Sequence, residues 1–256
     1  MSLDSAGINM RAERNLMMEN NVKTDVLFTS ATQMAEADNY NDWTFDLFKP
    51  YVKGKVLEVG CGVGSFTKRF IQQGSFQQML SIDISQDAVS YCQARFVHSG
   101  LEFQCIDLLM VRGKFDMIVC MNVLEHIEDH KGALAHLYNL LNPGGILFLL
   151  VPAHQALYSP FDVAAGHYRR YNKKMMAELL STAVSHTRYR LTQFYFNAVG
   201  ALGYGFVYKV MKKAPKAEAQ SEIGAFDKLV VPVMRNLESK FIPFGISLIT
   251  IVTKEK

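Results

Sequence analysis

The sequence predicts a single doubly wound α/β domain whose sheet is mostly parallel. Five short apolar segments alternate with longer segments of helical periodicity between residues 55 and 151. The apolar segments are continuous, which is typical of strands that are covered on both faces of a sheet. A chain of 256 residues is long enough for one domain with a full hydrophobic core.

The five apolar segments are predicted strands, and the segments between them are predicted crossover helices. The strands are Lys55–Val59, Met79–Ile84, Leu101–Ile106, Phe115–Met121 and Ile146–Val151. The helices include Ser65–Gln73, Asp87–His98 and Asp129–Leu141. Right-handed crossovers of this kind place helices on both faces of the sheet. A short helix within residues 40–51 precedes the first strand, and Pro50 ends it.

The chain changes character after the fifth strand. A polar and aromatic segment, 152–171, is followed by a helix that Asn172 is expected to cap. Two more strands are expected near Tyr189–Tyr195 and Ile246–Val252, which makes seven, and an amphipathic helix is expected around Phe226–Phe241. We therefore predict a variable N-terminal cap over residues 1–38 and one domain over residues 39–256. Within that domain, segments 152–171 and 197–241 are expected to cover a substrate.

Composition narrows the classes of partner and compartment. The net charge of +3 comes from 27 basic and 24 acidic residues without a concentrated basic patch, so we predict no nucleic-acid partner. The four cysteines form no C-x-x-C pair and are expected to be reduced core thiols: Cys61, Cys92, Cys105 and Cys120. The first residues do not have the pattern of a signal peptide, so a cytoplasmic protein is expected. Oligomeric state is left open.

One uncharged stretch of eighteen residues, Leu191–Tyr208, approaches the length of a membrane span. Thr192, Gln193, Asn197 and three glycines argue against a transmembrane helix, and the start of the stretch is better explained as the sixth strand. A helix from Asn197 onward, followed by lysines, is expected to pack on the core. The alternative is weak peripheral contact with a membrane surface or a cover over a hydrophobic acceptor.

A glycine-rich turn follows the first strand. The sequence LEVGCGVG places Gly60, Gly62 and Gly64 where backbone must approach a ligand closely. Residue 83 is an aspartate that closes the second strand, at a separation from the glycines that suits a carboxylate binding ribose hydroxyls. Glu58 lies inside the first strand, where a buried carboxylate needs a hydrogen-bond donor or a cationic partner. These residues predict a nucleoside pocket.

These motifs resemble the class I S-adenosylmethionine-dependent methyltransferases, particularly the type 11 group and its members with a GHYRRY sequence. The family's first motif reads E-x-G-x-G-x-G, and the resemblance covers about residues 40–185. It also includes the segment FDMIVCMNVLEHIEDH and the turn LNPGG. The resemblance implies a Rossmann-like seven-stranded sheet with an antiparallel last strand. It also implies S-adenosylmethionine as cofactor and S-adenosylhomocysteine as product.

The resemblance assigns cofactor contacts to individual residues. The glycines are implied to contact the methionine and adenosine parts, Asp83 the ribose, Ile84 the adenine face and Asp107 the adenine amino group. The full set of implied contacts is Glu58, Gly60, Cys61, Gly62, Gly64, Asp83, Ile84, Asp107, Leu108 and Asn122. Metal-dependent O-methyltransferases have acidic ligands near the end of the fourth strand, where this chain has Asn122. We therefore predict metal-independent transfer.

Three histidines follow the ends of the fourth and fifth strands and are candidates for a general base or for positioning the acceptor: His126, His154 and His167. The alternative for His126 is packing or capping at the start of a helix. The segment that contains His154 and His167 also has Tyr158, Arg169, Arg170 and Tyr171, which are candidates for substrate binding. Adjacent arginines suit a carboxylate or phosphate on the acceptor. Alternatively, one arginine pairs with Asp162 or a helix end, and the tyrosines pack.

Together these features predict methyl transfer to oxygen, nitrogen or carbon of a small-molecule or lipid-linked acceptor that carries negative charge. The alternative is a catalytically inactive S-adenosylmethionine-binding protein that serves as a regulator or partner, because the glycine turn and Asp83 indicate binding rather than turnover. A nicotinamide dehydrogenase is disfavoured because Ser65 replaces the third glycine of the dinucleotide fingerprint.

Overall fold

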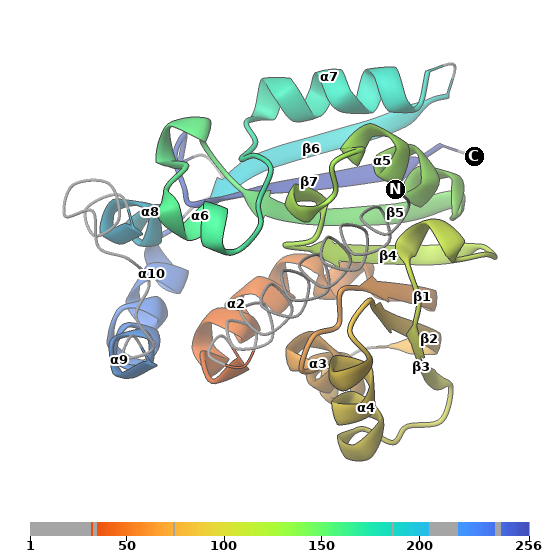
Figure 1. The fold of residues 1–256 in the computed structure, drawn as a ribbon, viewed down its shortest axis with the longest axis horizontal. Coiled ribbons are helices and arrows are strands. Elements are labelled where there is room, and N and C mark those ends of the chain that lie inside the picture. The colour runs from red at the N-terminus through yellow and green to blue at the C-terminus, as the bar shows by residue number, and fades with distance from the viewer. Residues whose placement is uncertain are drawn as a thin grey trace, which may run out of the picture.

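Seven strands form one sheet in the described part of the chain, in the order β3-β2-β1-β4-β5-β7-β6 (Figure 1). The strands are β1 Gly54–Val59, β2 Phe76–Asp83, β3 Leu101–Cys105, β4 Phe115–Met121, β5 Leu141–Pro152, β6 Tyr189–Phe196 and β7 Ser247–Lys254. Strands β1 to β5 pair in parallel, whereas β7 is antiparallel to both β5 and β6. The predicted doubly wound, mostly parallel sheet with an antiparallel last strand is confirmed.

The computed structural model describes residues 32, 35–73, 75–185, 187–204, 220–238 and 242–255. The predicted N-terminal cap, 1–38, lies almost entirely outside the described residues. The predicted covering segment 197–241 is described in part, by α8 Ala198–Tyr204, α9 Gln220–Leu229 and α10 Val231–Leu237.

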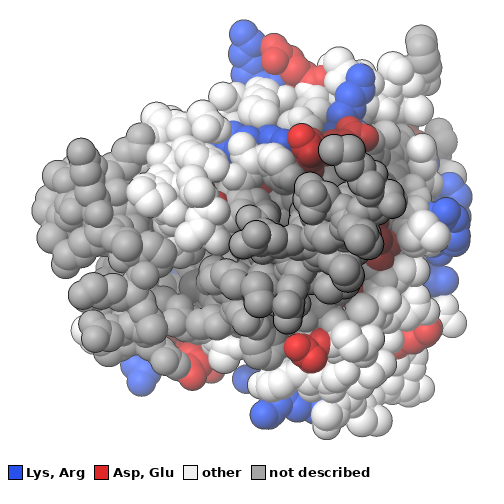
Figure 2. Space-filling model, viewed as in Figure 1, with Lys and Arg blue, Asp and Glu red and all other residues white. Residues whose placement is uncertain are grey.

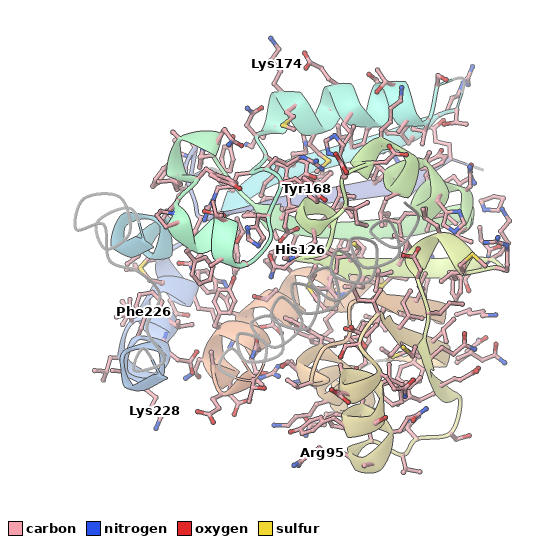
Figure 3. The ribbon with its side chains drawn as sticks, viewed as in Figure 1. Arg95, His126, Tyr168, Lys174, Phe226 and Lys228 are labelled. Atoms are coloured by element: carbon pink, nitrogen blue, oxygen red, sulfur yellow. The ribbon has the colours of Figure 1, made fainter. Side chains whose placement is uncertain are left out.

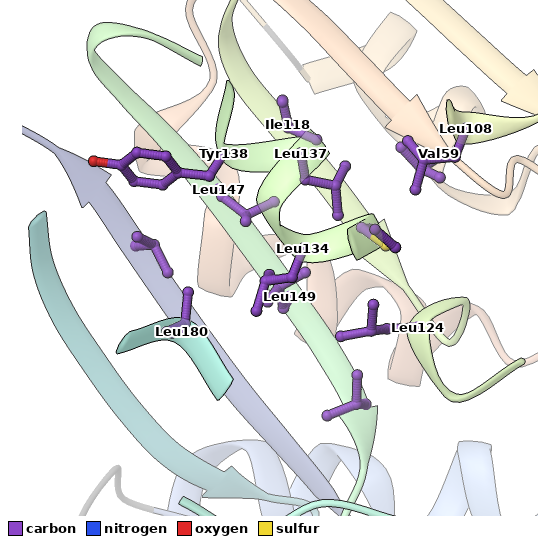
Figure 4. Close-up of a cluster of buried hydrophobic side chains, with 14 of the residues drawn as sticks. Val59, Leu108, Ile118, Leu124, Leu134, Leu137, Tyr138, Leu147, Leu149 and Leu180 are labelled. Carbon is purple, nitrogen blue, oxygen red and sulfur yellow. The ribbon is translucent and has the colours of Figure 1, made fainter. Parts of the chain in front are cut away.

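Helices cover both faces of the sheet, and alternate side chains of each central strand enter different cores. In β4, Ile118 and Cys120 face a cluster covered by α5 His130–Asn139 and α7 Lys173–Ala183 (Figure 4). The neighbouring Met117 and Val119 face a second cluster, which α2 Asp38–Phe48 and α3 Ser65–Gln73 cover. Because both faces are buried, the strand is apolar throughout, which explains why the sequence pattern identified it.

Several element boundaries differ from the predictions for identifiable reasons. Strand β5 begins at Leu141 because that residue already pairs with Phe115, and a register shift follows before Ile146 pairs with Met117. The single helix predicted around 226–241 is wrong: α9 ends at Leu229 and α10 begins at Val231. Pro232 stands in the first turn of α10, where proline is tolerated, but it cannot continue a preceding helix.

Local capping confirms one prediction, and side-chain exposure corrects another. The Asn172 side chain accepts a hydrogen bond from the Met175 amide at 2.8 Å, as expected for the N-cap of α7. Helix α4, Gln86–Arg95, begins after the Ser85 cap.

The expectation of four core thiols is corrected at one position. Cys61, Cys92 and Cys120 are buried free thiols, but Cys105 is exposed because it ends the edge strand β3.

The described surface carries mixed charge. On the face in Figure 2, described acidic and basic side chains are scattered among neutral residues. Among the described residues, no helix is long and apolar enough to cross a membrane. The eighteen-residue uncharged stretch instead begins in β6 and continues into α8.

A carboxylate from α9 caps the N-terminus of α2. Asp227 is 4% exposed, and its oxygens accept the backbone amides of Tyr40 at 2.8 Å and Asn39 at 3.1 Å. The residue that precedes α2, Ala37, has no capping side chain, so Asp227 satisfies amides that α2 itself cannot. This contact fixes α9 against α2.

Replacing Asp227 with alanine is expected to lower the free energy of unfolding by about 1–3 kcal/mol, because it leaves two partly buried amides without an acceptor. Chemical denaturation measures the change. The control is Asp87→Ala, an exposed residue in the first turn of α4, which is expected to cost less than about 1 kcal/mol. Equal effects of the two substitutions contradict the capping role.

Candidate cofactor and acceptor site

The direction of winding reverses between β1 and β4, and this point defines the candidate site. The chain adds β2 and β3 on one side of β1, then returns to place β4 and β5 on the other side. The carboxyl ends of these parallel strands lie at one edge of the sheet, where α/β folds of this type bind ligands. The loops that leave this edge after β1 and β4 contain residues 60–64 and 122–126.

The glycines of the first loop adopt backbone conformations that other residues avoid. Gly60, Gly62 and Gly64 have φ values of +77°, +52° and +78°. A Cβ on Gly60 lies only 2.4 Å from Cγ2 of Val123, which belongs to the loop after β4. A Cβ on Gly64 lies 2.3 Å from the ring of Phe96. Glycine is therefore required here both by φ and by space.

Asp83 connects the end of β2 to the glycine loop. Its Oδ2 accepts the Gly62 amide at 2.8 Å, and its Oδ1 accepts the Ser85 amide at 2.9 Å. Each carboxylate oxygen keeps a second lone pair for a hydroxyl donor. The next residue, Ile84, is 73% exposed, which is unusual for a large apolar side chain at a strand end. A carboxylate beside an exposed apolar side chain fits a ribose and its base.

Glu58 lies within the sheet and has protein partners. Its side chain is 2% exposed, and its Oε2 accepts hydrogen bonds from Thr67 Oγ1 at 2.5 Å and Ser81 Oγ at 2.8 Å. Burial raises the pKa of Glu58 to about 7, and the two hydroxyl donors oppose this shift. The expected hydrogen-bond donors for a buried carboxylate are thus found on α3 and β2.

The remaining predicted cofactor contacts occupy different environments around the same strand ends. Cys61 packs with Cys92 in a small buried cluster, and Leu108 belongs to the main core. Asp107 is exposed, and its Oδ1 accepts the Leu109 amide at 2.7 Å at the start of η2, Leu108–Met110. Asn122 follows β4 with φ +51° and is exposed. Contact of these residues with a cofactor stays a prediction.

The polar segment after β5 folds around one buried carboxylate. Asp162, on α6 Pro160–Ala164, is fully buried. Its Oδ1 binds His167 Nδ1 at 2.8 Å and accepts a hydrogen bond from Arg170 Nε at 2.8 Å, and its Oδ2 accepts the Ser159 amide at 2.9 Å. Arg170 is 2% exposed and also donates to the Ala153 carbonyl. The segment is therefore organised by a buried ion pair.

Three side chains lie close together where this segment meets the loop after β4: Glu125, His126 and His167. The first two belong to η3 Leu124–His126. Glu125 is fully buried, and neither carboxylate oxygen accepts a hydrogen bond from another described residue. Its Oε1 lies 4.0 Å from His167 Nε2, and the His126 and His167 rings are 4.7 Å apart. Figure 3 shows His126 and Tyr168 in this region, away from Arg95 on α4.

Burial shifts the pKa values within this group in opposite directions. It raises the pKa of Glu125 to about 8, although the nearby Arg170 opposes the shift. Burial and, to a smaller extent, the nearby His167 together lower the pKa of His126 to about 4. Both side chains therefore favour the neutral form at pH 7, and His126 is a poor proton acceptor in this environment.

The other predicted acceptor-site residues have protein partners. The His154 ring packs against Phe244 and Tyr195, with centroids 5.1 and 4.4 Å away, rather than joining the other two histidines. Tyr158 donates its hydroxyl proton to the His167 carbonyl at 2.6 Å. Tyr171 is fully buried, and its hydroxyl donates to the Leu124 carbonyl.

The two adjacent arginines have different protein partners, and contact of either one with an acceptor stays a prediction. Arg170 pairs with Asp162, which is the arrangement of the structural alternative. Arg169 is half-buried, and its guanidinium donates to the carbonyls of Ile127 at 2.6 Å and Glu128 at 3.1 Å. Arg169 is therefore the one of the two with a partly accessible side chain.

Sequence reasoning missed Glu125 and the central role of Asp162. A signal for Asp162 was present: Ser159 and Asp162 have the spacing of a capping box, which the structure forms at the start of α6. No comparable signal marks Glu125, because its neighbours His167 and Tyr168 come from the distant segment 152–171.

Gly60→Ala is expected to destabilise the fold by about 1–3 kcal/mol more than Gly113→Ala, because only the former drives a Cβ into Val123. Gly113 is a matched control, since its φ of +109° imposes backbone strain on alanine while the nearest atom is 4.0 Å away. Urea denaturation compares the two. A smaller effect at residue 60 contradicts the close approach of the loops.

Glu58→Gln is expected to gain stability relative to wild type as pH rises from 5 to 8. The folded-state pKa of about 7 exceeds the ordinary value of 4.5, so Glu58 ionises at lower pH in the unfolded chain, and the stability of the wild-type protein falls through this range. The difference is on the order of 3 kcal/mol. Unfolding free energies at four pH values test this, and a pH-independent gap between the two proteins rules it out.

Comparison with known proteins identifies the family. The profile of a family described as a methyltransferase domain matches residues 31–188, more than half of the chain. A ubiquinone biosynthesis O-methyltransferase from Xanthomonas euvesicatoria is 33% identical over 101 residues, which cover 37% of this chain and 41% of that protein. The matches to curated relatives of this kind span between 25% and 50% of the relatives' own lengths.

Solved structures share the fold at low identity. A Haloferax volcanii chain solved in complex with the Trm112 methyltransferase activator has a TM-score of 0.63 at 15% identity, covering 91% of this chain and 96% of that chain. Haemonchus contortus phosphoethanolamine N-methyltransferase 2, solved with S-adenosyl-L-methionine, has a TM-score of 0.59 at 15% identity, covering 85% and 53%. The chain therefore belongs to the class I S-adenosylmethionine-dependent methyltransferases and has their Rossmann-like fold.

Proposed function

We propose that this protein transfers a methyl group from S-adenosylmethionine to oxygen, nitrogen or carbon of a small-molecule or lipid-linked acceptor. The observation that carries the proposal is the arrangement of Asp83, Ile84 and the glycine loop at the point where the sheet reverses its winding. The carboxylate keeps lone pairs for two ribose hydroxyls, the exposed Ile84 offers an apolar surface to adenine, and the glycines leave room for backbone contact.

The chemistry places modest demands on the protein. When bound, the cofactor supplies an electrophilic methyl group: a bond forms from the acceptor to the methyl carbon while the carbon–sulfur bond breaks and its electron pair stays on sulfur. The protein has to hold the acceptor in line and exclude water. An acceptor hydroxyl or ammonium also has to lose a proton.

The residues around His167 suit acceptor positioning and proton removal. Asp162 binds His167 Nδ1, so the protonated tautomer at Nδ1 leaves the Nε2 lone pair toward Glu125 and the end of β4. His126 contributes the adjoining ring. His154 has aromatic neighbours instead, so its role in this proposal is to shape the wall beside β6 rather than to take the proton.

Arg169 supports an acceptor that carries a carboxylate or phosphate. Its guanidinium is half-buried beside the loop after β4. Its described partners are two backbone carbonyl groups and the Tyr168 ring, all neutral, and no described carboxylate lies within salt-bridge distance. An anionic group on the acceptor supplies that missing charge. Arg170 contributes indirectly, by holding Asp162 and thereby His167.

Binding of S-adenosylmethionine and S-adenosylhomocysteine is expected to be saturable in isothermal titration calorimetry and at least tenfold weaker in Asp83→Ala, because the ribose loses its acceptor. Glu178→Ala on the exposed face of α7 is the control and is expected to bind as wild type. Binding of NADH alone contradicts the proposal. Cofactor binding without turnover across an acceptor screen instead supports the inactive, regulatory alternative.

Arg169→Ala is expected to raise the KM for an anionic acceptor by about tenfold with a smaller change in kcat, because it removes a charge-assisted contact worth roughly 1.5 kcal/mol. Arg170→Ala is expected to lower the temperature of thermal unfolding in addition, because it removes the cationic partner of the buried Asp162 carboxylate. Steady-state kinetics and thermal unfolding separate the two effects. Unchanged acceptor affinity in both variants removes the anionic-acceptor proposal.

A further inference from the structure

We propose that Glu125, His126 and His167 form a binding site for a divalent transition-metal ion such as Zn²⁺. Each of these residues offers one ligand atom, and the three atoms lie within 4.8 Å of one another. Ligand atoms that are each about 2.1 Å from one ion lie roughly 3 Å apart, so side-chain shifts on the order of 1 Å bring the three together.

The Glu125 carboxylate provides the first argument. It is fully buried and receives no hydrogen bond from another described side chain or amide. Buried polar groups almost always have a partner, and both oxygens of Glu125 lack one whether the group is a neutral acid or the more costly carboxylate. Arg170 lies near Glu125, but its guanidinium is already bound to Asp162 at 2.8 Å. A cation between Glu125 and the two histidines supplies the partner that the carboxylate is missing.

The orientation of His167 provides the second, independent argument. Metal-binding histidines usually donate one ring N–H to a carboxylate, which fixes the tautomer and turns the other nitrogen toward the metal. His167 has this arrangement: Asp162 binds Nδ1 at 2.8 Å, and Nε2 lies 4.0 Å from Glu125 Oε1. Asp162 is in turn held by Arg170 and Ser159. The outer residues therefore hold His167 in the orientation that a ligand needs.

The donor set indicates the class of metal. Two imidazoles and one carboxylate suit Zn²⁺, Mn²⁺ or Fe²⁺, whereas Mg²⁺ and Ca²⁺ prefer oxygen ligands throughout. Three protein ligands leave coordination positions open, as in catalytic rather than structural zinc sites. This changes the expectation of metal independence, which was based on Asn122; the proposed ligands are Glu125 and His126, three and four residues later, together with His167.

The use of such an ion rests on the proposed methyl transfer. With the ion bound, His167 Nε2 is a ligand, so the metal takes over from His167 the task of promoting loss of the acceptor proton. The site lies beside the loop after β4, next to the Gly60–Val123 contact of the cofactor loop. A bound metal lowers the pKa of a coordinated hydroxyl, so the acceptor class that this site favours is one with a hydroxyl group. The ion also fixes the acceptor oxygen in place.

Titration of the metal-free full-length chain with Zn²⁺ tests the proposal. We expect one ion per chain, and at least tenfold weaker binding in each of Glu125→Gln, His126→Gln and His167→Gln, because each removes one of three ligands. Asp162→Asn is expected to weaken binding by about 10- to 100-fold through loss of His167 orientation. The control is His98→Gln. The His98 ring packs against Phe76 at the start of β2, so this variant is expected to bind Zn²⁺ as the wild type does.

Two further measurements make the outcome decisive. The absorption spectrum of the Co²⁺-substituted wild-type protein is expected to show ligand-field bands of a site with nitrogen and oxygen ligands. This measurement needs no variant, so it still tests the site if circular dichroism shows that the variants do not fold. S-adenosylmethionine binding to the same metal-free sample tests the proposed function separately. Cofactor binding without Zn²⁺ binding by the wild type, or equal loss in His98→Gln, overturns the metal site and leaves the methyltransferase proposal standing.

Discussion

The close approach of two loops at the carboxyl edge of the sheet is the constraint on which the candidate site depends. Strands β1 and β4 are neighbours although β2 and β3 separate them in the chain, so the loops that follow them meet. Gly60 allows this because a side chain there collides with Val123. The same contact places the cofactor loop beside Glu125 and His126, so cofactor and acceptor regions are joined by one packing contact.

A second layer of the site is organised by buried carboxylates rather than by apolar packing. Asp162 holds His167 and Arg170 in segment 152–171, and Glu58 joins α3 and β2 beneath the glycine loop. Burial makes each carboxylate depend on its hydrogen-bond donors. The strands and these polar networks together therefore determine the geometry of the loops, which explains how a mostly irregular segment is held at the sheet edge.

The sequence predicted most of the sheet because central strands are apolar on both faces; Phe115–Met121 and Ser65–Gln73 have the predicted boundaries. The cofactor loop was equally accessible, since glycine spacing and Asp83 follow directly from strand ends. The contact between Glu125 and His167 was not, because it joins residues 42 positions apart through an irregular segment without periodicity. Likewise, the pairing of Arg170 with Asp162 was one of two open alternatives until tertiary contacts were known.

A crystal structure of the protein soaked with S-adenosylhomocysteine tests the central claim most directly. We expect the ribose hydroxyls to lie within hydrogen-bond distance of the Asp83 carboxylate, the adenine to cover Ile84, and the amino-acid part to follow the backbone of residues 60–64. Density for the ligand at another place on the sheet, or none at saturating ligand, contradicts the assignment of this strand edge as the cofactor site.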